Sequence, residues 1–124
     1  MEEIKVGNQT LREDDLEIKV EYQGEMFIMA YPNQWTKAEI ERLIALKLGG
    51  MPRNSYTPEH VANIEAFTYV NELVNTDKSP SWFKSAWTCY NEELIQKLFA
   101  GYLAFRNKFR TKIQDGGFAG RGKK

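Results

Sequence analysis

The sequence of 124 residues has very few of the side chains that build metal centres or activate nucleophiles. It has one cysteine, Cys89, so no disulfide can form within the chain, and one histidine, His60. Zinc needs several histidine or cysteine ligands at close spacing, and a cysteine nucleophile needs a histidine base beside it. We therefore expect no metal centre. We interpret His60 as a surface or capping residue of a helix and Cys89 as a small buried apolar residue.

Long apolar runs are also absent. No window of the sequence approaches the roughly 20 apolar residues that cross a bilayer, and the opening residues MEEIKVGNQT do not resemble a secretory leader. We expect a cytoplasmic protein that does not contact a membrane. The formal net charge is zero, which disfavours a dedicated nucleic-acid-binding protein.

Three short segments resemble chemical sites only at first reading. Residues 13–15, EDD, lack the alternating spacing and the glycine of a calcium loop. Glu92 and Glu93 are adjacent on an expected helix and point about 100° apart, which does not suit an acid–base pair. The final GRGKK lacks the G-x-x-x-x-G-K-[ST] pattern of a phosphate-binding loop. The sequence therefore predicts no enzyme and no cofactor.

The charges are unevenly distributed along the chain. Residues 1–25 contain eight acidic and three basic residues, whereas residues 104–124 contain seven basic and one acidic residue. Opposite charges at the two ends suit head-to-tail association of copies or an electrostatic partner. Two solvated faces explain the same pattern, so both interpretations stay open. We expect residues 1–15 to be a loose acidic start, in which only EIKV could add a short strand.

Residues 16–31 carry a strand pattern. In LEIKVEY every second residue is apolar, which gives a strand one apolar and one charged face. Gln23 and Gly24 form a plausible two-residue turn before EMFIMAY, and Pro32 ends the second strand. The pattern predicts a β-hairpin over residues 16–31, whose apolar face the rest of the chain must cover.

The helical part is expected over residues 36–114. Thr36 and Glu39 make a T-x-x-E capping box at the start of a first helix, which GG at 49–50 ends. Thr57 with Pro58 opens a second helix. SWFKSAW, from residue 81, predicts a short helix or an aromatic plug, because its aromatic side chains are too large to be left exposed by chance.

The last helix is the longest. Asn91 precedes it as an N-cap, and its apolar stripe reaches about residue 113. Residues 115–124 form a basic, glycine-rich tail that cannot bury enough surface to order itself. The sequence as a whole predicts one α+β domain, with a short N-terminal β-hairpin followed by three or four helices, the last one long.

This order of elements resembles the small tail assembly chaperones of long-tailed bacteriophages. The likeness covers roughly residues 16–113. It lies in the hairpin, first helix and loop EYQGEMFIMAYPNQWTKAEIERLIALKLGGMPRNSY, in EAFTYVNELV, and in LFAGYLAFRNKFR near the C-terminus. It is a likeness of pattern and layout, since that family has no invariant catalytic motif.

The resemblance implies a protein that binds the tape measure protein, or another phage structural protein, and keeps that long apolar helical chain soluble while tail-tube subunits polymerise. It implies binding without a cofactor or turnover. Such proteins are often made in two lengths by ribosomal frameshifting, and Gly122-Lys123-Lys124 is where such a site could lie. Core packing is the default for the aromatic stripe of the last helix. The candidate partner-binding residues are Phe99, Tyr102, Phe105, Phe109, Arg106 and Arg110.

Two other functions stay open. A structural neck or head–tail joining protein would form an oligomeric ring of defined size and remain in the finished particle. A small nucleic-acid-binding regulator would use the basic tail and bind in a strongly salt-dependent way. A homo-oligomer fits the first of these alternatives.

Overall fold

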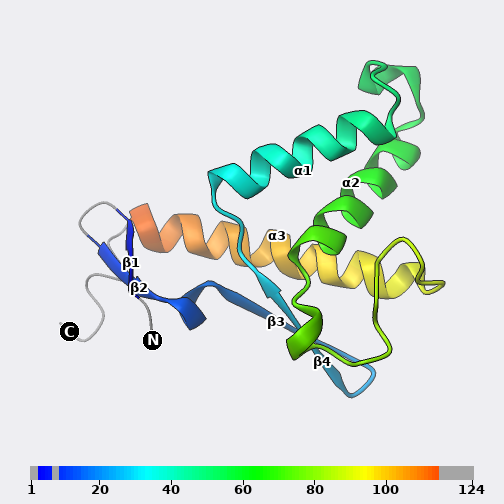
Figure 1. Cartoon of the computed structure of the whole chain (residues 1–124). Coiled ribbons are helices and arrows are strands. Elements are labelled where there is room, and N and C mark those ends of the chain that lie inside the picture. Colours follow the sequence, from blue (N-terminus) through cyan, green and yellow to red (C-terminus); the bar gives the residue numbers. More distant parts are fainter. Residues whose placement is uncertain (1–2, 7–8, 115–124) are drawn as a thin grey trace.

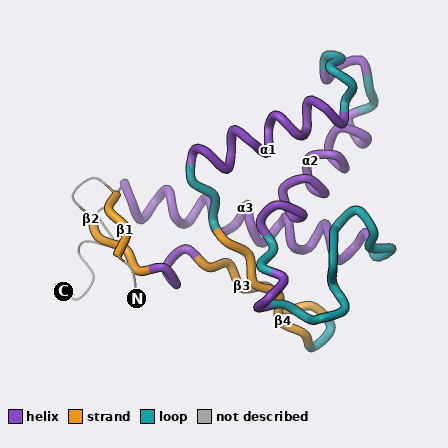
Figure 2. Tube along the Cα trace, in the orientation of Figure 1, coloured by secondary structure: helices purple, strands orange, loops and turns teal. Residues whose placement is uncertain are grey.

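The computed structural model describes residues 3–6 and 9–114, and it has the predicted α+β fold (Figures 1 and 2). A hairpin of β3 (Glu17–Tyr22) and β4 (Glu25–Ala30) precedes three α-helices. These are α1 (Gln34–Lys47), α2 (Pro58–Leu73) and α3 (Glu92–Gln114), of which α3 is the longest. The expected tail, residues 115–124, lies outside the described residues.

The predicted hairpin over residues 16–31 is confirmed. β3 and β4 pair antiparallel, with Tyr22 opposite Glu25 at the closed end. Gln23 and Gly24 have φ values of 52° and 82°, which are the positive values that a type I′ two-residue turn requires. The pairing continues beyond the strands, because the Tyr31 amide donates to the Leu16 carbonyl at 2.8 Å.

The expectation of a loose start over residues 1–15 is wrong for most of what the structure describes, but the short strand that EIKV could add is confirmed as β1. β1 (Glu3–Val6) and β2 (Gln9–Arg12) pair antiparallel, and the short 3-10 helix η1 (Glu13–Leu16) leads from them into β3. Leu11 is fully buried. One anchoring side chain in a polar segment is enough to dock a short strand pair, and alternation over four residues is too short a signal to reveal it.

The start of α1 also differs from the prediction. The Asn33 side chain accepts the Thr36 amide at 2.9 Å, so Asn33 is the N-cap and Thr36 lies inside the first turn. The expected capping box is wrong because an equally good cap stands three residues earlier, directly after the proline that ends the hairpin. Glu39 pairs instead with Arg42.

The other predicted helix ends are confirmed. Gly49 and Gly50 both have positive φ, and the Gly50 amide donates to the Ala45 carbonyl at 3.0 Å as the chain leaves α1. Thr57 caps α2 by accepting the His60 amide at 3.1 Å, with Pro58 at the first helical position. Asn91 caps α3 by accepting the Leu94 amide at 3.1 Å.

The core lies where the hairpin, the α1–α2 pair and α3 meet. α1 and α2 form a helical hairpin, and α3 packs against both α2 and β3 (Figure 1). The buried members of the core come from all of these elements and include Ile18, Phe27, Met29, Ile40, Ile44, Val70, Leu73, Leu94, Ile95, Leu98 and Tyr102.

The segment SWFKSAW forms no helix, and it is an aromatic plug only in part. Phe83 is buried and meets the Phe27 ring edge-on at a centroid distance of 5.6 Å. Trp82 and Trp87 remain 52% and 38% exposed, contrary to the expectation that their size would bury them. Trp82 donates its indole N–H to Glu25, and the Lys47 ammonium lies 4.5 Å from the Trp87 ring centroid. These polar contacts hold each indole at the surface.

Candidate partner-binding groove

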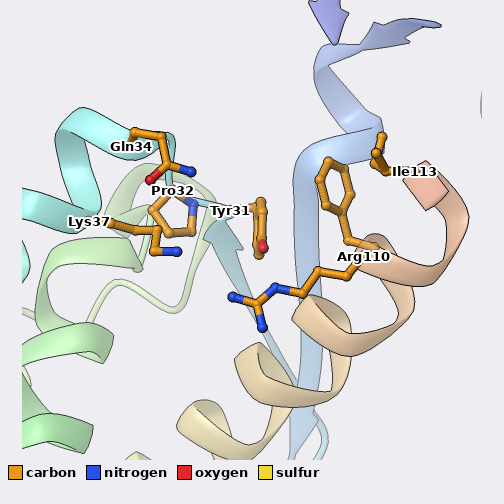
Figure 3. A pocket seen from close by; sticks show the side chains of 7 residues that line it. Tyr31, Pro32, Gln34, Lys37, Arg110 and Ile113 are labelled. Carbon is orange, nitrogen blue, oxygen red and sulfur yellow. The ribbon is translucent and has the colours of Figure 1, made fainter. Parts of the chain in front are cut away.

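An open groove of about 530 Å³ lies between the start of α1 and the end of α3. Figure 3 shows Tyr31 and Pro32 on one side of it, and Arg110 and Ile113 of α3 on the other. We refer to it as the α1–α3 groove. Its lining residues are Tyr31, Pro32, Gln34, Lys37, Phe109, Arg110 and Ile113.

The groove exists because α3 is longer than the core that it covers. The last fully buried residue of α3 in the core is Tyr102, while the helix continues to Gln114. Phe109 and Ile113 are spaced i, i+4 on the same face of this extension and are only half-buried. Opposite them the chain leaves β4 through Pro32 and turns into α1. The wall formed by this turn therefore faces an apolar helix surface.

Aromatic rings join the groove to the core. The Tyr31 ring contacts Phe109, Phe105 and Tyr102 of α3, with centroid distances of 4.7, 5.3 and 6.0 Å. Tyr102 in turn stacks on Tyr69 of α2 at 5.2 Å. This ladder of rings packs the apolar floor of the groove against the core.

The groove is basic as well as apolar. Lys37 and Arg110 line it, and among the described residues no acidic side chain does so. Arg106, one turn before Arg110, has its guanidinium carbon 5.9 Å from the centroid of the Tyr102 ring. Burial raises the pKa of the Tyr102 phenol, and the nearby Tyr31 adds to this, while Arg106 and Arg110 act in the opposite direction. Both arginines therefore act electrostatically on the same buried hydroxyl.

Two polar atoms next to the groove have no hydrogen-bond partner within the described part of the chain. They are the Tyr102 hydroxyl and the Nε of Arg106, and both are buried. An unsatisfied buried polar group costs about 1–3 kcal/mol.

The structure distributes the six candidate partner-binding residues over different environments. Phe109 and Arg110 line the groove. Tyr102 is only 1% exposed and cannot touch a partner directly, whereas Phe99 and Phe105 are half-buried against the core. Arg106 is half-buried beside Tyr102.

Sequence reasoning missed the rest of the groove. Tyr31, Pro32, Gln34 and Lys37 come from the hairpin end and α1, and Ile113 was placed in the stripe without a binding role. Pro32 follows the end of β4 just before α1, and this position indicates a sharp change in chain direction. The sequence does not show that the end of α3 reaches this corner.

Other features add no chemical site. Within residues 3–6 and 9–114, no three His, Cys, Asp or Glu side chains gather as metal ligands. His60 is exposed and lies against Tyr56 at 5.1 Å, and Cys89 is half-buried beside the core. None of the described helices is both long and apolar enough to cross a membrane.

Comparison of the chain with protein-family models, curated proteins and solved structures found no match.

Proposed function

We propose that the protein is a non-enzymatic tail assembly chaperone, which binds the tape measure protein of a long-tailed phage in the bacterial cytoplasm and keeps it soluble. The observation that carries this proposal is the α1–α3 groove, an open and largely apolar hollow at the end of a long helix. The likeness in layout over residues 16–113 supports the same assignment.

The groove suits an amphipathic helix as its occupant. Such a helix presents apolar side chains at i, i+3, i+4 and i+7, which enter an apolar groove as a row of anchors. The volume of the groove, about 530 Å³, is that of a small-molecule pocket, which suits a few anchor side chains of such a helix. Covering the apolar surface of the partner removes it from water, which favours the complex by a gross term of about 25 cal/mol per Å², before the entropy cost of association, and prevents the partner chains from aggregating.

Co-expression with the tape measure protein of the same phage tests the proposal. We expect the soluble fraction of the tape measure protein to rise when the chain is present. The rise should be lost in the double variant Phe109→Ser, Ile113→Ser, which removes the apolar floor. Leu46→Ser is the matched control, because Leu46 is an exposed apolar residue of α1 outside the groove. No rise in solubility with the unaltered chain would refute the proposal.

A ring-forming neck or head–tail joining protein is the second candidate, and one observation favours it. Trp82 and Tyr90 are exposed around a hollow of about 340 Å³ that precedes α3, so it lies at the opposite end of this helix from the groove. Two different apolar surfaces at opposite ends suit head-to-tail contacts, which close into rings. A discrete oligomer by light scattering, together with presence in finished particles, would support this candidate over the chaperone.

A further inference from the structure

We infer that the α1–α3 groove selects an acidic amphipathic helix, whose carboxylate binds the cations of the groove while its apolar side chains cover Phe109 and Ile113. This inference rests on the proposed function and adds the chemistry by which the partner is recognised. The cations in question are Lys37 and Arg110, which line the groove, and we refer to them as the groove cations.

The groove cations have no acidic partner within the groove. Some other cations of the fold do, since Arg42, Arg53 and Lys78 each pair with a glutamate of the same chain. In the described part of the chain, neither groove cation forms an ion pair, and both line the same hollow. Charges left without an internal partner beside an apolar surface are complementary to an acidic ligand.

Carboxylate chemistry fits the cations that line the groove. A carboxylate supplies two acceptor oxygens and binds a guanidinium through parallel hydrogen bonds. Arg110 is an exposed residue whose guanidinium lines the groove. A partner carboxylate can therefore bind Arg110 without reaching the buried Nε of Arg106 or the buried Tyr102 hydroxyl.

The apolar lining favours a protein helix over nucleic acid. Tyr31, Pro32, Phe109 and Ile113 form most of the groove wall. A phosphate backbone would engage the cations but would leave these apolar side chains in water. A helix with glutamates beside its apolar stripe covers both kinds of surface at once.

Three synthetic helices test the inference on the full-length chain. They share one apolar stripe of leucines and carry glutamate, glutamine or lysine beside it. Fluorescence anisotropy of the labelled helices gives their affinities. We expect the glutamate helix to bind at least about tenfold more tightly than the lysine helix, since the sign of its charge is the only change.

Variants of the chain assign the effect to the groove. Arg110→Gln with Lys37→Gln should weaken binding of the glutamate helix about fivefold to tenfold and leave the glutamine helix nearly unchanged. Lys108→Gln is the matched control, because Lys108 is an exposed cation of α3 that does not line the groove. Circular dichroism spectra check that each variant keeps its helices.

The outcomes separate this inference from the proposed function. Equal binding of all three helices, lost in the Phe109→Ser, Ile113→Ser variant, would overturn acidic selection and leave the chaperone proposal standing. Failure of every helix, together with no gain in tape measure solubility, would refute both. Tighter binding of a DNA or RNA oligonucleotide, or a dimer of the chain that Arg110→Gln dissociates, would assign the groove to a different occupant and overturn the inference.

Discussion

Gly101 is the residue that sets how closely α3 lies on the hairpin. A Cβ atom added at Gly101 would stand 2.5 Å from Cγ2 of Val20 on β3. Carbon atoms pack at roughly 3.5–4.0 Å, so only glycine allows this approach. From the sequence alone, Gly101 is a residue of low helix propensity inside a helix. No local pattern indicates that β3 packs against α3 at this position.

We expect Gly101→Ala to destabilise the fold, by about 1–3 kcal/mol of free energy of unfolding, because the added methyl group overpacks the contact with Val20. In a solvent-exposed helix the same change would stabilise by about 1 kcal/mol, so the two effects predict opposite signs. Urea denaturation measures the difference. When Val20 is already alanine, the crowding methyl group is gone. Adding Gly101→Ala to Val20→Ala should therefore lower the free energy of unfolding much less than Gly101→Ala does in the unaltered chain. A more stable Gly101→Ala single variant would show that the contact is loose.

Tyr69 links the stability of the fold to alkaline pH. Burial raises the pKa of its phenol, and the hydrogen bond that it donates to Glu41 at 2.9 Å adds to this. The unfolded phenol ionises near pH 10. The neutral form is therefore favoured in the folded state, and its contribution is complete below pH 10 and lost as the pH rises above that value.

We therefore expect the free energy of unfolding to fall as the pH rises above about 10, and to fall less steeply in Tyr69→Phe. Part of the slope should remain, because burial also raises the pKa of Tyr102. Tyr90→Phe is the control, since Tyr90 is fully exposed. Urea titrations across this pH range give the slopes. Identical slopes for Tyr69→Phe and the unaltered chain would contradict this assignment.

Among the elements, α1 gives the sharpest test of how a helix start is chosen. The structure assigns the cap to Asn33, whereas the pattern T-x-x-E assigns it to Thr36. We expect Asn33→Ala to lower stability by about 0.5–2 kcal/mol, because the Thr36 amide loses its acceptor. Thr36→Ala should change it by much less, since its hydroxyl caps nothing. If thermal or urea denaturation showed a larger loss of stability for Thr36→Ala than for Asn33→Ala, Thr36 would be the N-cap instead.

Much of the fold could be predicted because its signals are local. The Gln23-Gly24 turn, the Thr57 and Asn91 caps and the glycines after α1 each act within a few residues of the end that they define. The β2 strand and the start of α1 could not be predicted in this way. The first is anchored by a single buried Leu11, and the second had two competing caps within four residues.

The groove was harder to predict than the elements that form it. Helical periodicity identified the face of α3 that carries Phe109, but it does not say which turns of that face extend beyond the core. Tyr31 and Lys37 join the groove from segments more than 70 residues away. Such a juxtaposition depends on tertiary packing, which no local pattern records.

At the scale of the whole molecule, the described start of the chain lies near the end of the longest helix. Figures 1 and 3 place the β1–β2 hairpin near the C-terminal end of α3. The strands of this hairpin are not acidic, because they carry Glu3, Lys5 and Arg12. The acidic residues that follow lie in η1, β3 and β4. This proximity therefore does not account for the uneven charge distribution, and the cations of the groove are better evidence for a partner than the overall balance.

The same arrangement predicts two levels of stability within the chain. Leu98 belongs to the central core, whereas Leu11 is fully buried but is not part of that cluster. Leu98→Ala should lower the free energy of unfolding by about 2–5 kcal/mol and reduce amide protection throughout α3 and the β3–β4 hairpin. Leu11→Ala should speed hydrogen exchange in β2 and leave the protection of α3 around Leu98 unchanged, because local opening of an outlying unit does not require global unfolding. Equal losses of protection around Leu98 in both variants would show instead that β1–β2 and the core unfold as one cooperative unit.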